Sequence, residues 1–173
     1  DCSCEAAARS DRACWIGGDV TRLPFRDASL DVVTMLDVLE HLDEDLAALS
    51  EVWRVLAPGG HVLLTVPALP GLWSLRDDLA GHRRRYLHGP LMALVSNAGF
   101  QVLECRYAFF LLLPVTWLSR FSARRLGWFP AAEQALPAWL NTWLLWICRL
   151  EQGLSRWLAW PAGSSLLLLA RKP

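Results

Sequence analysis

The stretch GGDVTRLPFRDASLDVVTMLDVLEHL, residues 17–42, places acidic side chains directly after two apolar segments. Asp19 follows CWIGG, residues 14–18, a short apolar run that ends on glycine and predicts a strand. Residues 31–36, DVVTML, contain β-branched residues and predict a strand buried on both faces. Asp37, Glu40 and His41 come just after this second strand. Ligands of open α/β sheets bind at the carboxyl ends of the strands, so we expect a ligand site beside these side chains.

The rest of the chain alternates predicted helices and strands. Residues 43–60 predict a helix with Asp43 as N-cap and with the Pro58-Gly59-Gly60 turn as its end. Its apolar stripe comprises Leu46, Leu49, Val52, Trp53 and Leu56. Residues 61–67, HVLLTVP, predict a strand that ends at proline. A helix is predicted from Pro90 to Gly99, and the last strands are predicted at residues 100–110 and 164–173. This order indicates an α/β fold with a parallel sheet covered on both faces.

Charge and composition narrow the classes of partner. Seventeen basic and seventeen acidic residues cancel, which argues against nucleic acid as a partner. A hydrophobic content of 54% is ample for a core. The five cysteines show neither zinc-site spacing nor a dense disulfide pattern, so we predict no metal and a cytoplasmic location.

Four segments in this order resemble class I S-adenosylmethionine-dependent methyltransferases of the small-molecule type. GDVTRLPFRDASLDVV is similar to the family's third strand and LPF turn leading into the fourth strand, and LDVLEHLDED to the segment after that strand. EVWRVLAPGGHVLLTVP resembles the helix, PGG turn and fifth strand, and DCSCEAAAR the segment that follows the second strand. The resemblance implies a Rossmann-like methyltransferase sheet and S-adenosylmethionine as cofactor.

The resemblance also assigns cofactor-binding roles. Asp1 matches the acid that binds the ribose hydroxyls. Asp19 matches the acid that accepts from the adenine amino group, while the N–H of Val20 meets a ring nitrogen. Leu36, Asp37 and His41 match residues that line the methionine side. Each residue also has a plainer interpretation: Asp19 as a turn acid, Asp37 as a helix-entry acid and His41 as a polar residue at a helix start.

The glycine-rich loop and first strand of the family have no counterpart here. We therefore expect an amino-terminally truncated enzyme that lacks the centre of its sheet and binds cofactor poorly, with the strand at residues 14–18 displaced, unpaired or mispaired. The expected domains are a partial methyltransferase domain at 1–108, a helical Trp-rich insertion at 109–161 and the final strand of the sheet at 162–173.

The segment GHRRRYLHGPL, residues 81–91, follows the predicted strand that ends at Pro67 and supplies acceptor-site candidates. Arg84, Arg85 and Tyr86 could bind an anionic or polar acceptor, and His82 could act as a general base. The plainer interpretation is a solvated basic loop without an orienting partner for the histidine.

Seven of the ten tryptophans lie between Arg106 and Pro161. Uncharged runs there are shorter than the roughly 20 residues that a spanning helix needs. Trp139, Trp143 and Trp146 form a helical stripe, which favours a place in the core. The alternatives are a lid over a hydrophobic acceptor and a peripheral membrane contact.

Together these features predict methyl transfer to a small or lipid-like acceptor. A nicotinamide-dependent oxidoreductase and a non-catalytic module that binds a membrane or a partner remain as alternatives.

Overall fold

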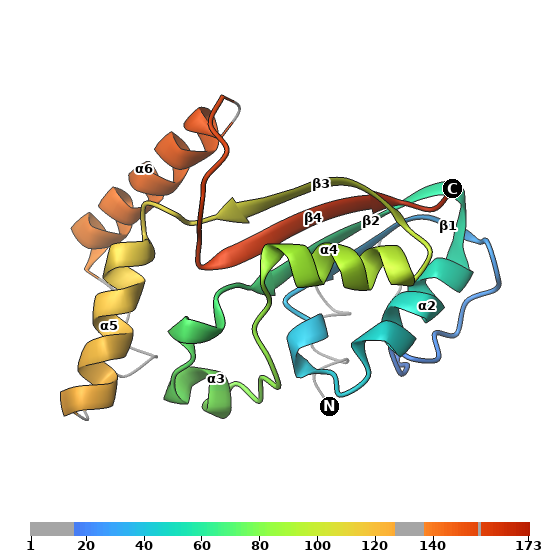
Figure 1. The fold of residues 1–173 in the computed structure, drawn as a ribbon, viewed down its shortest axis with the longest axis horizontal. Coiled ribbons are helices and arrows are strands. Elements are labelled where there is room, and N and C mark those ends of the chain that lie inside the picture. The colour runs from blue at the N-terminus through green and yellow to red at the C-terminus, as the bar shows by residue number, and fades with distance from the viewer. Residues whose placement is uncertain (1–15, 127–136, 156) are drawn as a thin grey trace.

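The structure is a computed structural model that describes residues 16–126, 137–155 and 157–173, and it is a mixed α/β fold (Figure 1). Its described strands are β1 (Leu30–Leu36), β2 (Leu56–Pro67), β3 (Gln101–Ala108) and β4 (Ser165–Arg171). Its described helices are α2 (Asp45–Val55), α3 (Leu75–Leu79), α4 (His88–Asn97), α5 (Leu113–Leu126) and α6 (Ala138–Leu154), with 3-10 turns η1 (Leu39–His41) and η2 (Pro70–Leu72).

The four strands form one sheet in the order β1-β2-β4-β3. β1 and β2 are parallel, with Val33 opposite Val62. β4 runs antiparallel to both of its neighbours, so that Leu168 faces Leu64 on β2 and Cys105 on β3. The predicted parallel direction is therefore confirmed for β1 and β2, and β3 runs the same way because β2 and β3 are both antiparallel to β4. No direction was predicted for β4. An apolar run such as SLLLLAR indicates a buried strand but carries no information on its direction.

The core lies between the sheet and helices α2 and α4, which cover the same face (Figure 1). Leu64 and Leu168 from the sheet and Leu49 and Leu91 from the helices are all fully buried. The other face is less covered within the described residues, because Val32 of β1 is 60% exposed. The prediction of a sheet covered on both faces is therefore wrong for this part of the chain.

Several element boundaries differ from those predicted. Asp43 is not the N-cap of α2; its carboxylate lies 3.3 Å from the Arg83 guanidinium, and the cap position falls on Glu44. α2 ends at Val55, and β2 begins at Leu56 and runs through the Pro58-Gly59-Gly60 turn, where Gly59 has a φ of 81°. α4 begins at His88, two residues before the predicted start, which places Pro90 in its first turn.

The predicted strand at residues 14–18 is not present over its described part. Residues 16–18 belong to no strand, while 14 and 15 lie outside the described residues. Among the residues that the structure describes, the first pairing is an isolated bridge between Asp19 and Arg22. The expectation that this segment does not join the sheet in the family's manner is therefore confirmed for residues 16–18.

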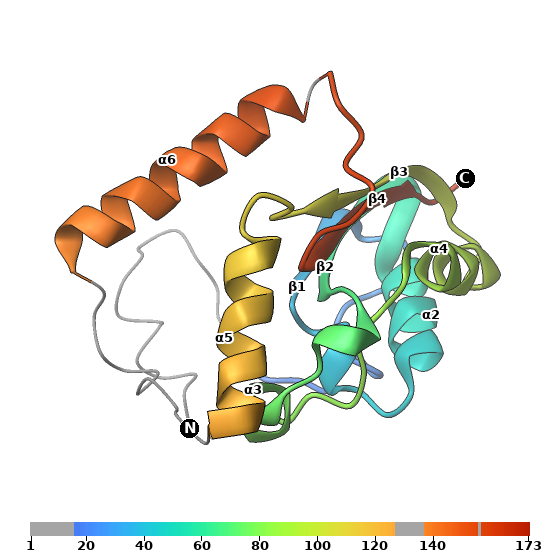
Figure 2. The same ribbon diagram turned by 60° about the vertical axis from the view of Figure 1, so that its left-hand side comes forward.

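Helices α5 and α6 lie between β3 and β4 in the sequence and stand beyond the end of the sheet where β3 ends (Figure 2). Glu151 ties α6 to this end, since its carboxylate accepts the N–H groups of Phe110 and Leu111 at 2.9 and 3.0 Å. Trp139, Trp143 and Trp146 are 67%, 60% and 57% exposed, so their predicted place in the core is wrong. None of the described helices combines the length and the apolar character needed to cross a membrane.

Candidate functional site

Asp37 is held at the carboxyl end of β1 by the neighbouring strand. Its φ of 53° turns the chain sharply, and its N–H donates to the carbonyl oxygen and the hydroxyl of Thr65 at 3.0 and 3.1 Å. The Thr65 hydroxyl in turn donates to the Asp37 carboxylate at 3.2 Å. A non-glycine residue in this conformation is strained and is typical of functional sites. Leu36, just before it, is 56% exposed, so both predicted residues face outward at the strand end.

A cavity of about 490 Å³ opens at this end of the sheet. Leu36, Asp37 and Thr65 form one wall, and the ends of β3 and β4 together with α6 form the others. The lining residues are Leu36, Asp37, Thr65, Arg106, Tyr107, Ala108, Phe109, Cys148, Glu151, Gln152, Ser155, Ser165, Leu166 and Leu167. Its size is within the range of small-molecule sites, and apolar walls with a few polar groups are typical of such sites.

Asp19 lies in an exposed turn that α2 holds in place. Its Oδ1 accepts the N–H and the hydroxyl of Thr21, both at 2.8 Å, and these bonds lower the pKa of the carboxyl. The adjacent LPF turn is clamped because Leu23 donates its N–H to Glu51 at 2.7 Å and Arg54 donates to the carbonyl oxygens of Leu23 and Phe25. Val20 packs partly against the core.

The described part of the structure does not connect the two predicted halves of the cofactor site, the Asp19 turn and Asp37 at the end of β1, by a direct contact that a hydrogen bond would mark. Among the described residues no hydrogen bond links the Asp19 turn to Asp37. Asp1, the predicted ribose ligand, lies outside the described residues.

His41 points toward a second cluster, formed with Glu40 and His82. One potential ligand atom from each of the three side chains lies within 4.8 Å of the others. The two imidazole rings meet edge to face with centroids 4.8 Å apart. The backbone joins the two segments, since the Arg83 N–H donates to the Glu40 carbonyl oxygen at 2.6 Å.

Glu40 is fully buried, and neither of its carboxylate oxygens has a hydrogen-bond partner in the described part of the chain. Burial raises the pKa of this carboxyl, and the nearby Asp37 acts in the same direction. A buried polar group without a partner is uncommon in folded proteins and calls for an explanation.

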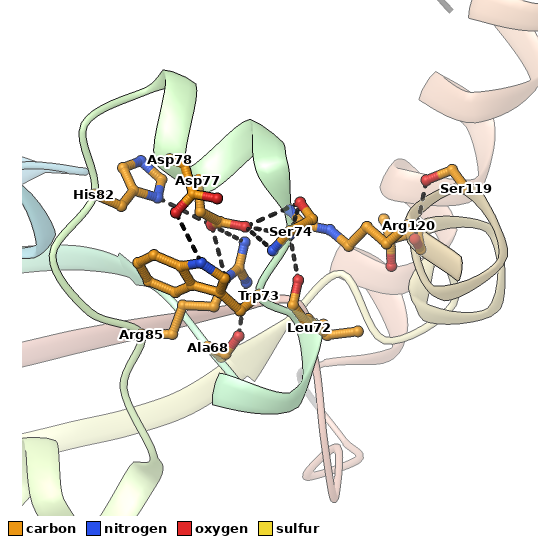
Figure 3. A network of polar contacts seen from close by, with 11 residues as sticks. Ala68, Leu72, Trp73, Ser74, Asp77, Asp78, His82, Arg85, Ser119 and Arg120 are labelled. Carbon is orange, nitrogen blue, oxygen red and sulfur yellow. Dashed lines mark hydrogen bonds and ion pairs between the residues drawn. The ribbon is translucent and has the colours of Figure 1, made fainter. Parts of the chain in front are cut away.

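Asp77, which had no predicted role, is the centre of a buried polar network (Figure 3). Its carboxylate accepts from Arg85 Nε at 2.8 Å, from Arg120 Nη1 at 2.6 Å and from the Ser74 N–H at 2.8 Å. His82 Nδ1 lies 3.1 Å from the same carboxylate. Burial opposes ionisation, but the hydrogen bonds from both arginines hold the pKa of Asp77 well below its usual range.

The predicted acceptor-binding residues are therefore already partnered within the chain. The Arg85 side chain is 3% exposed and also donates to the Ala68 carbonyl oxygen at 2.9 Å. The Tyr86 hydroxyl lies 3.0 Å from the Asp45 carboxylate, and Arg84 lies 3.0 Å from the same carboxylate. These contacts give the three side chains structural roles, and their binding of an acceptor stays a prediction.

Sequence reasoning placed Glu40 beside the site without giving it a role, and it missed Asp77 and Arg120. Asp77 had a detectable signal, since Ser74 and Asp77 have the spacing of a helix capping box. Arg120 had none, because its partner lies 43 residues away in the sequence.

Comparison with known proteins points to the family that the sequence motifs resemble. Residues 2–64 match the model of a methyltransferase domain family. A "probable S-adenosylmethionine-dependent methyltransferase" of Mycolicibacterium smegmatis is 38% identical over 87 residues, which cover 49% of this chain and 34% of the relative. A demethylmenaquinone methyltransferase of Beutenbergia cavernae is 34% identical over 93 residues, covering 54% of this chain and 38% of the relative.

The fold agrees as well. A SAM-dependent methyltransferase structure from Archaeoglobus fulgidus superposes with a TM-score of 0.56 at 15% identity, over 96% of this chain and 71% of that one. At this identity the likeness shows the Rossmann-like methyltransferase fold alone. The matched part of this chain spans about a third of the length of the curated relatives. The sequence motifs and these matches together make residues 2–64 similar to a methyltransferase domain, and the whole described fold is like that of class I S-adenosylmethionine-dependent methyltransferases, whose cofactor is S-adenosylmethionine.

Proposed function

We propose that the protein carrying this chain transfers a methyl group from S-adenosylmethionine to a small, lipid-like acceptor. The observation that carries the proposal is the cavity of about 490 Å³, because it begins at Leu36 and Asp37 and is bordered by α6. Cofactor at the strand ends and acceptor in the cavity would then meet beside Asp37.

The residues present fit the cofactor. Both hydrogen bonds to Asp19 use its Oδ1, so Oδ2 is available to accept from the adenine amino group, with the Val20 N–H beside it. Asp37 presents a carboxylate at the strand end, next to the exposed Leu36, for the methionine side of the cofactor. Asp1 stays the candidate for the ribose hydroxyls. The bound cofactor supplies an electrophilic methyl group on a positively charged sulfur.

The chain's own residues would act mainly by holding the reactants together. Placing two reactants in the correct orientation can supply a large part of a rate enhancement. The positive charge of the sulfonium disperses as the methyl moves, so an apolar cavity wall, such as that formed by Leu166, Leu167 and Phe109, suits the reaction.

His82 stays the candidate base for an acceptor that must lose a proton, although it does not line the cavity. The sequence showed no orienting partner for it, but Asp77 lies 3.1 Å from its Nδ1. This contact favours the tautomer with the proton on Nδ1 and leaves Nε2 able to accept a proton. His41 packs edge to face against His82, and its predicted place on the methionine side of the cofactor stays a prediction.

Two observations support a lipid-like acceptor. Several curated relatives are named demethylmenaquinone or ubiquinone/menaquinone methyltransferases, and these names point to quinone acceptors in those proteins. Within this chain, the cavity joins apolar strand residues to α6, whose tryptophans are exposed.

Filling the cavity from α6 tests the proposal. Cys148 lines the cavity, whereas Leu145 on the same helix is half exposed and does not line it. With methyl-labelled S-adenosylmethionine and demethylmenaquinone as probes, Cys148→Trp should raise the KM for the quinone roughly tenfold or more and leave cofactor affinity unchanged. Leu145→Trp is the matched control and should behave like wild type. Unchanged quinone kinetics in Cys148→Trp would show that the acceptor binds elsewhere.

A further inference from the structure

We propose that Glu40, His41 and His82 form a binding site for a divalent transition-metal cation of the zinc class. The sequence predicted no metal, because no metal-binding cluster is visible in it: His82 lies 42 positions after Glu40 and 41 after His41. The fold brings them together, with one potential ligand atom from each within 4.8 Å of the others. Among the metals, imidazole and carboxylate ligands suit Zn²⁺ well.

Glu40 supplies the first argument. Its carboxylate is fully buried and both oxygens lack a hydrogen-bond partner among the described residues. A buried carboxylate normally needs a counter-charge or hydrogen bonds. The nearby guanidinium of Arg85 does not serve it, because Nε and Nη2 donate to Asp77 and Nη1 donates to the Ala68 carbonyl oxygen. A bound cation would supply the missing partner.

His82 supplies the second, independent argument. Ligand histidines in metal sites usually donate their other ring N–H to a carboxylate, which fixes the tautomer and the ring orientation. Asp77 stands in this position, 3.1 Å from His82 Nδ1, and is itself fixed by Arg85, Arg120 and Ser74 (Figure 3). With the proton on Nδ1, the lone pair of Nε2 is available to a cation.

His41 completes the set and provides access. It is the last residue of η1, next to Glu40, and its side chain is exposed, so a cation could enter from this side. The hydrogen bond from the Arg83 N–H to the Glu40 carbonyl oxygen keeps the η1 and His82 segments together before any cation arrives.

The three potential ligand atoms, which lie within 4.8 Å of one another, would need to move only slightly closer to bind one cation. Ligand atoms around one tetrahedral Zn²⁺ lie about 3.4 Å apart, which follows from bond lengths near 2.1 Å. Rotation of the exposed His41 ring would bring its nitrogen closer. Three protein ligands leave a fourth position for water or for an oxygen of a bound acceptor, the arrangement typical of catalytic rather than structural zinc.

The proposal changes the expected role of His82 but does not depend on methyl transfer. A nitrogen that holds a cation cannot also accept a proton. In the metal-bound protein the cation would instead lower the pKa of a hydroxyl bound at the fourth position.

The test is titration of the protein with Zn²⁺ by isothermal calorimetry, without cofactor or acceptor and without a polyhistidine tag. Cys2, Cys4 and Cys14 are replaced by serine throughout, because thiolates also bind zinc. The variants are Glu40→Gln, His41→Ala and His82→Ala, and His61→Ala on β2 is the control. His41 is exposed, so His41→Ala should fold normally, as circular dichroism would verify.

The expected result is one Zn²⁺ per chain, retained in His61→Ala and weakened at least tenfold in each of the three site variants. Absence of zinc binding would overturn the proposal. So would equal affinity in wild type, His41→Ala and His82→Ala, since the ion would then bind elsewhere. Either failure leaves the methyl-transfer proposal untouched.

Discussion

Replacing Asp77 with asparagine tests whether the buried network in Figure 3 organises this part of the fold. The substitution keeps the size of the side chain but removes the negative charge that faces Arg85 and Arg120. The Arg85 side chain is 3% exposed and cannot turn to water, whereas that of Arg120 is 22% exposed and can. The cost therefore comes mainly from the Arg85 charge.

Removing one partner of a buried ion pair costs about 3–5 kcal/mol, because the other charge stays buried without compensation. Domains unfold with free energies of about 5–15 kcal/mol, so the loss is a large share of the total. With an m-value of about 2 kcal/mol per molar urea, the unfolding midpoint should fall by about 2 M.

Urea unfolding followed by circular dichroism measures the effect, and Asp78→Asn is the matched control. Asp78 is the neighbouring residue, is exposed and accepts one hydrogen bond from the Trp73 indole at 3.0 Å. Its replacement should cost no more than about 1 kcal/mol. A loss below 1 kcal/mol for Asp77→Asn would refute the assignment of Asp77 as the counter-charge of Arg85.

Three further predictions concern pH and packing. The pKa of Asp77 is lowered in the folded protein, so the contribution of this carboxylate to stability is complete above the ordinary Asp pKa of 3.8 and is lost as the pH falls through the lower folded pKa. Acid unfolding should show this loss in wild type and not in Asp77→Asn. Burial raises the pKa of Glu40 above 4.5, so the charged carboxylate destabilises the metal-free fold as the pH rises. In urea titrations with a chelator, Glu40→Gln should match wild type below pH 4.5 and become the more stable of the two at higher pH. Equal stability at pH 8 would contradict the buried charge. A Cβ at Gly163 would collide with the backbone of Ala108, so Gly163→Ala should lose about 1–3 kcal/mol, whereas Gly153→Ala, with open space around it, should lose none.

The sequence located all four described strands of the sheet, because apolar runs such as residues 31–36 and 61–67 are interrupted by turn residues. It also predicted a strand at residues 14–18, of which the described residues 16–18 belong to none. It could not give the direction of β4, since Leu166 and Leu168 are buried equally well in either orientation. It also misplaced the start of α2, because Asp43 has the chemistry of a cap but is paired with Arg83.

The tryptophan stripe of α6 shows the limit of periodicity. Trp139, Trp143 and Trp146 have helical spacing, which indicates one face of a helix but not what covers that face. Glu151 fixes the other end of α6 at the β3 terminus, and the three tryptophans of the stripe are 57–67% exposed.

The site was predictable only where its residues are close in sequence. Asp37 and His41 follow β1 directly and were identified from that position. The meeting of Glu40 with His82, and of Asp77 with Arg120, depends on contacts across about 40 residues and required the structure.

Cofactor binding tests the central claim, that the residues after β1 and in the Asp19 turn form the S-adenosylmethionine site. Calorimetric titration of the protein carrying this chain with S-adenosylmethionine should give one site per chain. Affinity should fall roughly tenfold or more in Asp19→Ala and in Asp37→Ala, because each removes a hydrogen-bond acceptor, and should not change in His61→Ala. Wild-type affinity in both aspartate variants would contradict the account, since the cofactor would then bind without the Asp19 turn and without the carboxyl end of β1.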